Sequence, residues 1–330
     1  MKKKFVFKDK YVSYLIVILM FLAAVILVNT GMASRKLQSW LVPICINIIL
    51  AVSLNLTVGF LGELTLGHAG FMSVGAYAGC IFSQATQAVL PAAVRFPAAI
   101  LVGGLAAALF SVIIGIPVLR LKGDYLAIVT LAFGEIVKSI IINLNITGGA
   151  AGLRGTPQDS NYYWAFALAL ITVVVISNLT ESGQGRAIKA IRDNRIAAEA
   201  SGIDVTYYRL LAFVVAAFFA GVAGVLYGHN YSILSAGTFD YNKSIEILVL
   251  VVLGGLGSIR VSIIAATLLY ILPESLRGLH DYRMIIYSVV LILIMLINSS
   301  EQFAGLKDLL DVRKAIAKIR NKNKKGETEA

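Results

Sequence analysis

Long apolar runs without a charged residue make up most of this chain. A hydrocarbon core about 30 Å thick needs about 20 consecutive apolar residues in a helix, and most of the runs reach that length. The pattern therefore predicts an all-α polytopic membrane protein with about ten transmembrane helices. The predicted spans are 11–34, 37–62, 64–94, 96–119, a fifth that starts near Tyr125, then 160–180, 210–239, 247–259, 261–273 and 284–300.

Two of these runs, 247–259 and 261–273, are short. At about 1.5 Å per residue each covers only ~20 Å, which is less than the hydrocarbon thickness. Gly254, Gly255 and Gly257 lie between them and form a candidate helix break, because glycine is a poor helix former. The segment is either two short crossings, giving ten helices, or a re-entrant hairpin beside eight helices. We favour ten, and both alternatives place the two termini on the same side.

Composition excludes several other classes. Of 330 residues, 58% are hydrophobic and only 14% are charged, against ~25% charged in soluble domains, so a soluble enzyme, a disordered chain and a coiled coil are not expected. The net charge is +11, and 21 of the 29 Lys and Arg residues fall on one side of the predicted topology. Basic residues collect in cytoplasmic loops, so both termini are predicted to be cytoplasmic. The positive charge is thus explained by membrane orientation and does not indicate binding of nucleic acid. The predicted organisation is a basic N-terminus (1–10), a permease domain (11–300) and an amphipathic, basic tail (301–330).

One cytoplasmic loop, 181–208, is much longer than the other connections. A helix is predicted from Arg186 to Arg192, and Asn194 is a suitable N-cap for a second, short helix ending at Ala200. Gly202 stands where a glycine ends a helix. Two interpretations are open: an amphipathic helix lying on anionic headgroups, or a helix that docks into a cytosolic partner.

The sequence AAEASGIDV, 197–205, resembles the "EAA…G" coupling loop of ABC importer permeases. Three further blocks resemble branched-chain amino acid permeases of the LivM type, in the hydrophobic amino acid and urea permease family: GELTLGHAGFMSVGAYAG at 62–79, LKGDYLAIVTL at 121–131 and SIEILVLVVLGGLGS at 244–258. The resemblance covers roughly 47–300. It implies ATPase coupling by Arg192, Asn194, Ala197, Ala198, Glu199 and Gly202.

The resemblance also implies partners. The chain has no G-x-x-x-x-G-K-[ST] segment, so ATP is expected to be used by two cytosolic ATPase subunits and no cofactor is expected on this chain. The other expected partners are a second, homologous permease, an extracytoplasmic binding protein and the lipid bilayer, in a bacterial or archaeal cytoplasmic membrane. The alternatives are a urea or short-amide permease of the same family and a stand-alone secondary transporter. A membrane enzyme is less favoured, because no catalytic or metal-binding cluster is visible in the sequence.

Ionisable residues within the apolar runs are candidates for the translocation path, because they are costly in lipid and tend to face protein or water. Glu135 and Lys138 are spaced to pair on one helix face, which suits either an internal ion pair or a polar step for a zwitterion. Glu63 and His68 are expected to be interface or packing residues rather than residues of the path. Glu246 is expected to satisfy backbone N–H groups at the start of its helix.

Overall fold

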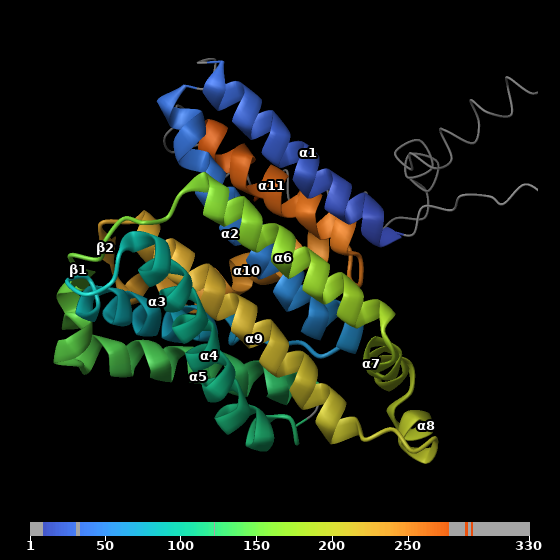
Figure 1. Cartoon of the computed structure of the whole chain (residues 1–330). Helices are drawn as coiled ribbons and strands as arrows, with labels where there is room; N and C mark the ends of the chain where they lie inside the picture. Colours follow the sequence, from blue (N-terminus) through green and yellow to red (C-terminus); the bar gives the residue numbers. More distant parts are fainter. Residues whose placement is uncertain (1–8, 31–33, 122, 277–287, 290–291, 293–330) are drawn as a thin grey trace, which may run out of the picture. The chain divides into compact units, whose positions relative to one another are not determined.

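The computed structural model describes residues 9–30, 34–121, 123–276, 288–289 and 292. The chain divides into two compact units, 1–272 and 273–330, and the first holds almost all of the described residues. The last predicted span, 284–300, and the predicted tail, 301–330, lie almost wholly outside the described part. The helices and strands follow in chain order (Figure 1): α1 (Asp9–Asn29), α2 (Arg35–Asn55), the π-helix η1 (Leu56–Leu61), α3 (His68–Ala85), α4 (Ala92–Val118), α5 (Asp124–Asn143), the short 3₁₀ turns η2 (Asn145–Thr147) and η3 (Gly149–Ala151), β1 (Leu153–Arg154), α6 (Tyr162–Glu181), α7 (Gly183–Asp193), α8 (Arg195–Ala200), α9 (Val205–Asn230), β2 (Ile233–Leu234), the 3₁₀ turn η4 (Ala236–Phe239), α10 (Tyr241–Leu253) and α11 (Ile259–Ser275).

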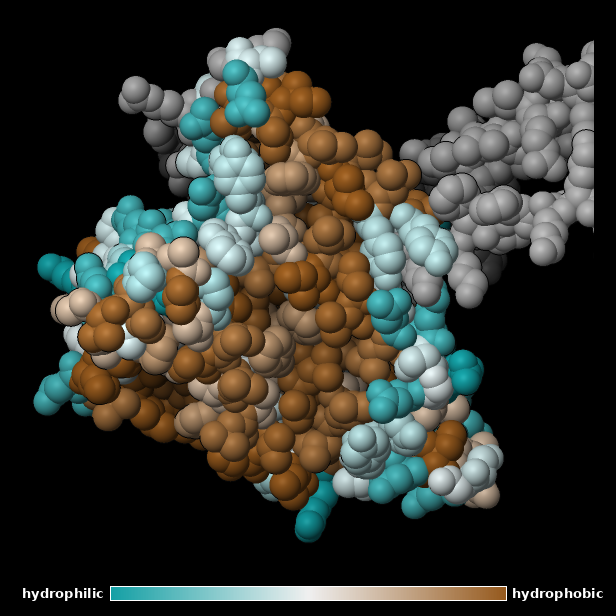
Figure 2. Space-filling model, viewed as in Figure 1, coloured by the Kyte–Doolittle hydropathy of each residue, from teal (hydrophilic) through white to brown (hydrophobic). Residues whose placement is uncertain are grey.

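Within the described residues, six helical segments are long and apolar enough to cross a membrane: α1, α2 with η1, α4, α5, α6 and α9. Figure 2 shows a broad apolar surface between hydrophilic residues that gather around β1 and β2 and around α7 and α8. Helices α4 and α5 contribute to the apolar exterior with large exposed side chains such as Leu105, Ile113 and Ile136. These observations confirm an all-α, multi-pass membrane protein, while the total of ten crossings stays a prediction.

Three glycines let α3, α4 and α9 cross in close contact. A Cβ atom on Gly75 of α3 would overlap the backbone of Gly221 in α9, and one on Gly103 of α4 would lie 2.6 Å from the carbonyl oxygen of Gly75. Close approach of this kind is how small residues promote helix packing in membranes. These contacts make α3, α4 and α9 a closely packed group of three helices.

Helix α2 is buried along most of its length, whereas α1 lies on the outside. In the most apolar 18-residue window of each span, 94% of the α2–η1 segment is buried within the protein, against 17% of α1. Helix α1 packs on α6 through Phe21 and Phe166, whose ring centroids are 5.5 Å apart. The hydroxyl of Tyr14 also donates to Asn178 at 3.3 Å.

Contacts with distant parts of the chain hold the connector between α5 and α6. Strand β1 pairs antiparallel with β2, joining Leu153 to Leu234. Arg95 of α4 forms an ion pair with Asp159 at 2.6 Å, and Gln84 of α3 donates to the carbonyl oxygen of Arg154 at 2.9 Å. Partners on α3, α4 and β2, all distant in sequence, therefore fix the position of this loop.

Substitution of Gly75 by alanine is expected to destabilise the bundle. The new methyl group would collide with the Gly221 backbone, and overpacking of this kind costs roughly 1–3 kcal/mol. The thermal unfolding midpoint of the purified protein in detergent should fall. Gly134→Ala in α5 is the matched control, because its nearest neighbour, the Gly70 nitrogen, would be 3.9 Å from the new Cβ. Equal midpoints for the two variants would contradict the close crossing.

Candidate functional site

The α7–α8 segment is a capped pair of helices that connects α6 to α9 (Figure 1). Helix α7 begins where the Ser182 hydroxyl accepts a hydrogen bond from the Gly185 nitrogen at 3.3 Å. One face of α7 is buried through Ala187, Ile188 and Ile191. The prediction of one helix across Arg186–Arg192 is confirmed, and the structure extends it to Gly183–Asp193.

Helix α8 is closed at both ends by its own sequence. The Asn194 side chain accepts from the Ala197 nitrogen at 3.0 Å, as an N-cap does. At the other end Gly202 has φ +81°, its N–H donates to the Glu199 carbonyl at 3.0 Å, and the N–H of Ile203 donates to the Ala198 carbonyl at 3.1 Å. This pair of bonds is a Schellman motif. The predicted cap and stop are therefore confirmed.

The surface of α8 combines small, charged and apolar side chains. Ala198 is buried, whereas Ala197 and Glu199 are exposed. Ile196 is 80% exposed, a large apolar side chain that the sequence analysis did not single out. Its exposure beside Glu199 gives this short helix the mixed character of a contact surface.

Arg192 links α7 to the π-helix η1. Its Nε and Nη2 atoms donate to Asp193 at 3.1 and 3.0 Å, and its Nη1 donates to the carbonyl oxygen of Gly59 at 3.1 Å. Gly59 lies in the last turn of η1, where carbonyl groups lack a partner within the helix. Gly62 is needed beside this contact, because a Cβ there would lie 2.6 Å from Cγ of Arg192.

The predicted helix break is present and is anchored by Asn55. Gly255 and Gly257 both have φ +78°, a backbone conformation that favours glycine, whereas Gly254 keeps helical angles. The fully buried Asn55 side chain accepts from the Gly257 nitrogen and donates to the Ser262 hydroxyl, each at 2.9 Å. It joins the end of α2 to both sides of the break between α10 and α11.

Gly59 makes this junction possible. A Cβ on Gly59 would overlap both the Asn55 side chain and the Gly257 backbone. The carbonyl of the same residue receives Arg192. Thus α7, η1 and the 254–258 loop meet at a single glycine, a convergence that the sequence analysis missed because its members are far apart in the chain.

Glu63 and His68 both have partners within the chain. Glu63 forms an ion pair with Arg209 of α9, whose side chain is 4% exposed. Burial raises the pKa of Glu63, while the positive charge of Arg209 opposes that shift. His68 lies 2.9 Å from the Ser53 hydroxyl and is buried. These contacts hold both side chains within the chain, and their assignment as interface or packing residues stays a prediction.

Glu135 and Lys138 pair at 3.0 Å on α5, and the side chain of Glu135 is 36% exposed. The second carboxylate oxygen of Glu135 accepts from the Tyr241 nitrogen at 3.0 Å, at the start of α10. A role for this pair on the substrate path stays a prediction.

The expectation for Glu246 was wrong. The first turn of α10 is capped by Asp240, which accepts from the Lys243 nitrogen at 3.1 Å, together with Glu135. Glu246 lies further along the helix and pairs with Lys243 at 3.1 Å. The N-terminus begins earlier than the apolar run indicated, so a residue placed at the run's start is already inside the helix.

Residues 36–298 match the family model described as "Branched-chain amino acid transport system / permease component". The chain belongs to this permease family. The permease is 34% identical over 286 residues to the high-affinity branched-chain amino acid transport system permease protein LivM of Salmonella typhimurium. The aligned region covers 76% of this chain and 66% of that protein. It is 33% identical over 317 residues to LivM of Escherichia coli, covering 86% of this chain and 72% of that protein.

A weaker similarity connects the permease to a second group. It is 29% identical over 133 residues to the permease protein LivH of Escherichia coli, which covers 39% of this chain and 42% of LivH. No solved structure gives a significant match. The family assignment therefore rests on sequence similarity. The contacts around Gly59 show how α7, η1 and the 254–258 loop are joined in this member.

Substitution of Asn55 by leucine is expected to loosen the break in the permease. The change leaves the Gly257 N–H and the Ser262 hydroxyl without the Asn55 side chain, and a buried unsatisfied group costs about 1–3 kcal/mol. Amide hydrogen exchange across 254–258 should become faster. Asn143→Leu on the exposed end of α5 is the control, since among the described residues the Asn143 side chain bonds only within its own helix, to the Ser139 carbonyl. Unchanged exchange in Asn55→Leu would contradict the anchoring role.

Proposed function

We propose that this permease is the membrane-spanning subunit of an ATP-driven importer for branched-chain amino acids. The match to the permease family over 36–298 carries this proposal. The LivM proteins at 33–34% identity are named for the same transport system, which supports the substrate class.

The proposed assembly contains more than one kind of subunit. Two cytosolic ATPases hydrolyse ATP, and an extracytoplasmic binding protein delivers the amino acid. Escherichia coli has a LivM and a LivH protein, each named as a permease protein of a high-affinity branched-chain amino acid transport system, and the chain is similar to each. A second, homologous permease beside this chain is the arrangement that these similarities support.

Helix α8 is the proposed contact with an ATPase. Its exposed Ile196 can enter an apolar cleft, while Glu199 and Arg195 beside it can fix the register of the contact. The caps at Asn194 and Gly202 hold the helix as one unit. A displacement of α8 then reaches α7, to which it is directly joined.

Arg192 carries the displacement further into the bundle. It holds the Gly59 carbonyl, and the neighbouring Asn55 holds the 254–258 loop. Movement of α7 therefore acts on the end of α2 and on the break between α10 and α11. We infer that this junction converts closure of the ATPases into rearrangement of the helices around the path.

The same contacts support two short crossings for α10 and α11. Strand β2, shortly before α10, pairs with β1 in the connector that follows α5, whereas α10 ends at the loop that contacts Asn55 and lies beside Gly59. The 13 residues of α10 cover about 20 Å at 1.5 Å each, and α11 returns with 17 residues. With both crossings the helix total is ten, and both termini are cytoplasmic.

The substrate class is tested by uptake into liposomes that contain the whole complex and its cognate binding protein. ATP-dependent uptake of leucine and valine is expected, because the similarity is to branched-chain permeases. Urea is the comparison substrate, since short-amide permeases share the family motifs. Uptake of urea without leucine, or uptake that persists after ATP depletion and collapses with a protonophore, would contradict the proposal.

The role of α8 is tested by Glu199→Arg and by Gly202→Val. The first reverses the charge of the contact surface. The second places a β-branched residue at φ +81°, which unwinds the Schellman motif. Uptake should fall at least ten-fold while the ATPases retain their basal hydrolysis.

Gln87→Arg serves as the control for the coupling variants. Gln87 is exposed beyond the end of α3 and lies outside the α7–α8 segment, so uptake should be close to that of the wild type. Normal uptake in both Glu199→Arg and Gly202→Val would show that α8 does not carry the coupling.

A further inference from the structure

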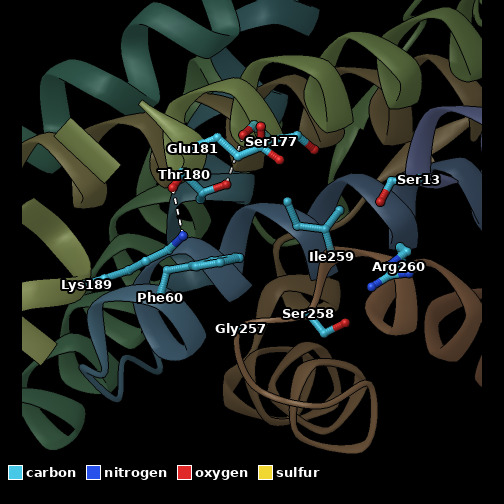
Figure 3. Close-up of a pocket in the computed structure, with 10 residues that line it drawn as sticks. All are labelled: Ser13, Phe60, Ser177, Thr180, Glu181, Lys189, Gly257, Ser258, Ile259 and Arg260. Carbon is cyan, nitrogen blue, oxygen red and sulfur yellow. Dashed lines mark hydrogen bonds between the residues drawn. The ribbon is translucent and has the colours of Figure 1, made fainter. Parts of the chain in front are cut away.

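A polar cavity of about 190 Å³ lies between the end of α6, helix α7 and the start of α11 (Figure 3). Its size is below the ~300–1,000 Å³ typical of sites for drug-sized ligands, so it suits a small polar molecule or the headgroup of a larger one. The cavity borders the junction described above. It is lined by Ser13, Phe60, Ser177, Thr180, Glu181, Lys189 and the segment 257–260.

Charges of both signs line this cavity. Lys189 and Arg260 supply positive charge, and Glu181 supplies negative charge. The Lys189 ammonium already donates to the Thr180 carbonyl at 2.8 Å and lies 5.3 Å from the centre of the Phe60 ring. An ammonium group has three donors, so Lys189 retains donors for a ligand.

Ser177 gives an independent sign that the cavity takes a ligand. The residue is 2% exposed, and its hydroxyl oxygen has no hydrogen-bond partner in the described part of the chain. A buried polar group without a partner is unfavourable and requires an explanation. A ligand atom in the cavity would supply that partner.

The first turn of α11 adds a preference for an anion. The helix begins at Ile259, which lines the cavity beside Ser258. The first N–H groups of a helix have no partner within it and carry partial positive charge. An anionic group placed there would also lie near Lys189 and Arg260, while Glu181 suits a cation.

We propose that this cavity binds a zwitterion, a ligand with an anionic group and an ammonium group a few ångströms apart. Two molecules at this edge of the membrane have that chemistry. One is a free α-amino acid, which rests on the proposed function because it would be the transported product. The other is the headgroup of an aminophospholipid. Either ligand would bridge α7 to the 257–260 segment, next to the contact of Arg192 with Gly59.

Binding is measured on the purified complex of permease and ATPases without the binding protein. One arm titrates radiolabelled leucine into complexes in nanodiscs made only of phosphatidylglycerol. The other arm uses native mass spectrometry to compare retention of phosphatidylethanolamine and phosphatidylglycerol. We expect saturable binding of leucine in the first arm, or preferential retention of phosphatidylethanolamine in the second, and the positive arm identifies the source of the ligand.

Three variants test the cavity itself. Lys189→Met and Arg260→Met should each weaken that binding at least ten-fold, and Ser177→Ala, which removes only a hydroxyl group, should weaken it several-fold. Lys36→Met is the matched control, because Lys36 lies on α2 against Trp40 and does not line the cavity. It should bind as the wild type does.

The proposal is overturned if neither leucine nor phosphatidylethanolamine binds, or if binding is the same in all four variants. Ser177→Ala guards against a variant that fails to fold, since its hydroxyl has no partner to lose within the described chain. The measurement involves no transport. Failure of leucine uptake would therefore count against the proposed function alone, and failure of binding in both arms against this inference alone.

Discussion

The structure around the end of α2 depends on hydrogen bonds to backbone polar groups at places where regular helices stop inside the bundle. Lipid offers no hydrogen bonds, so irregular backbone at membrane depth survives only where protein or water supplies partners. Here the chain changes from α2 to a π-helix, and α10 breaks before α11 begins. Arg192 donates to the π-helix at the Gly59 carbonyl, and Asn55 bonds to Gly257 and Ser262 on the two sides of the break. Gly59 leaves room for the Asn55 side chain and the Gly257 backbone.

Local signals explain which parts of the structure the sequence predicted. Asn194 and Gly202 act on backbone groups within a few residues, so the cap and the stop of α8 follow from the sequence around them. The glycines at 254–257 predicted the break for the same reason. Glu135 and Lys138 are one helical turn apart, and their pairing was predicted as well.

Contacts between distant residues explain what the sequence did not reveal. Asn55 and Ser262 are 207 positions apart, and nothing near either residue indicates the other. Glu246 shows a related failure, because the apolar run marks where a helix becomes buried and α10 begins earlier, at Tyr241. The prediction of the number of crossings met a similar difficulty, since α10, with 13 residues, is too short to be recognised as a span by its length and composition.

The six-residue length of α8 has a mechanical consequence. At 1.5 Å per residue the helix is only about 9 Å long, and it is closed by a cap at one end and a Schellman motif at the other. The hydrogen bonds at its two ends oppose unwinding of so short a helix, which would be marginal without them. Force applied to Ile196 would therefore pass to α7 and α9, the helices that flank α8 in the chain.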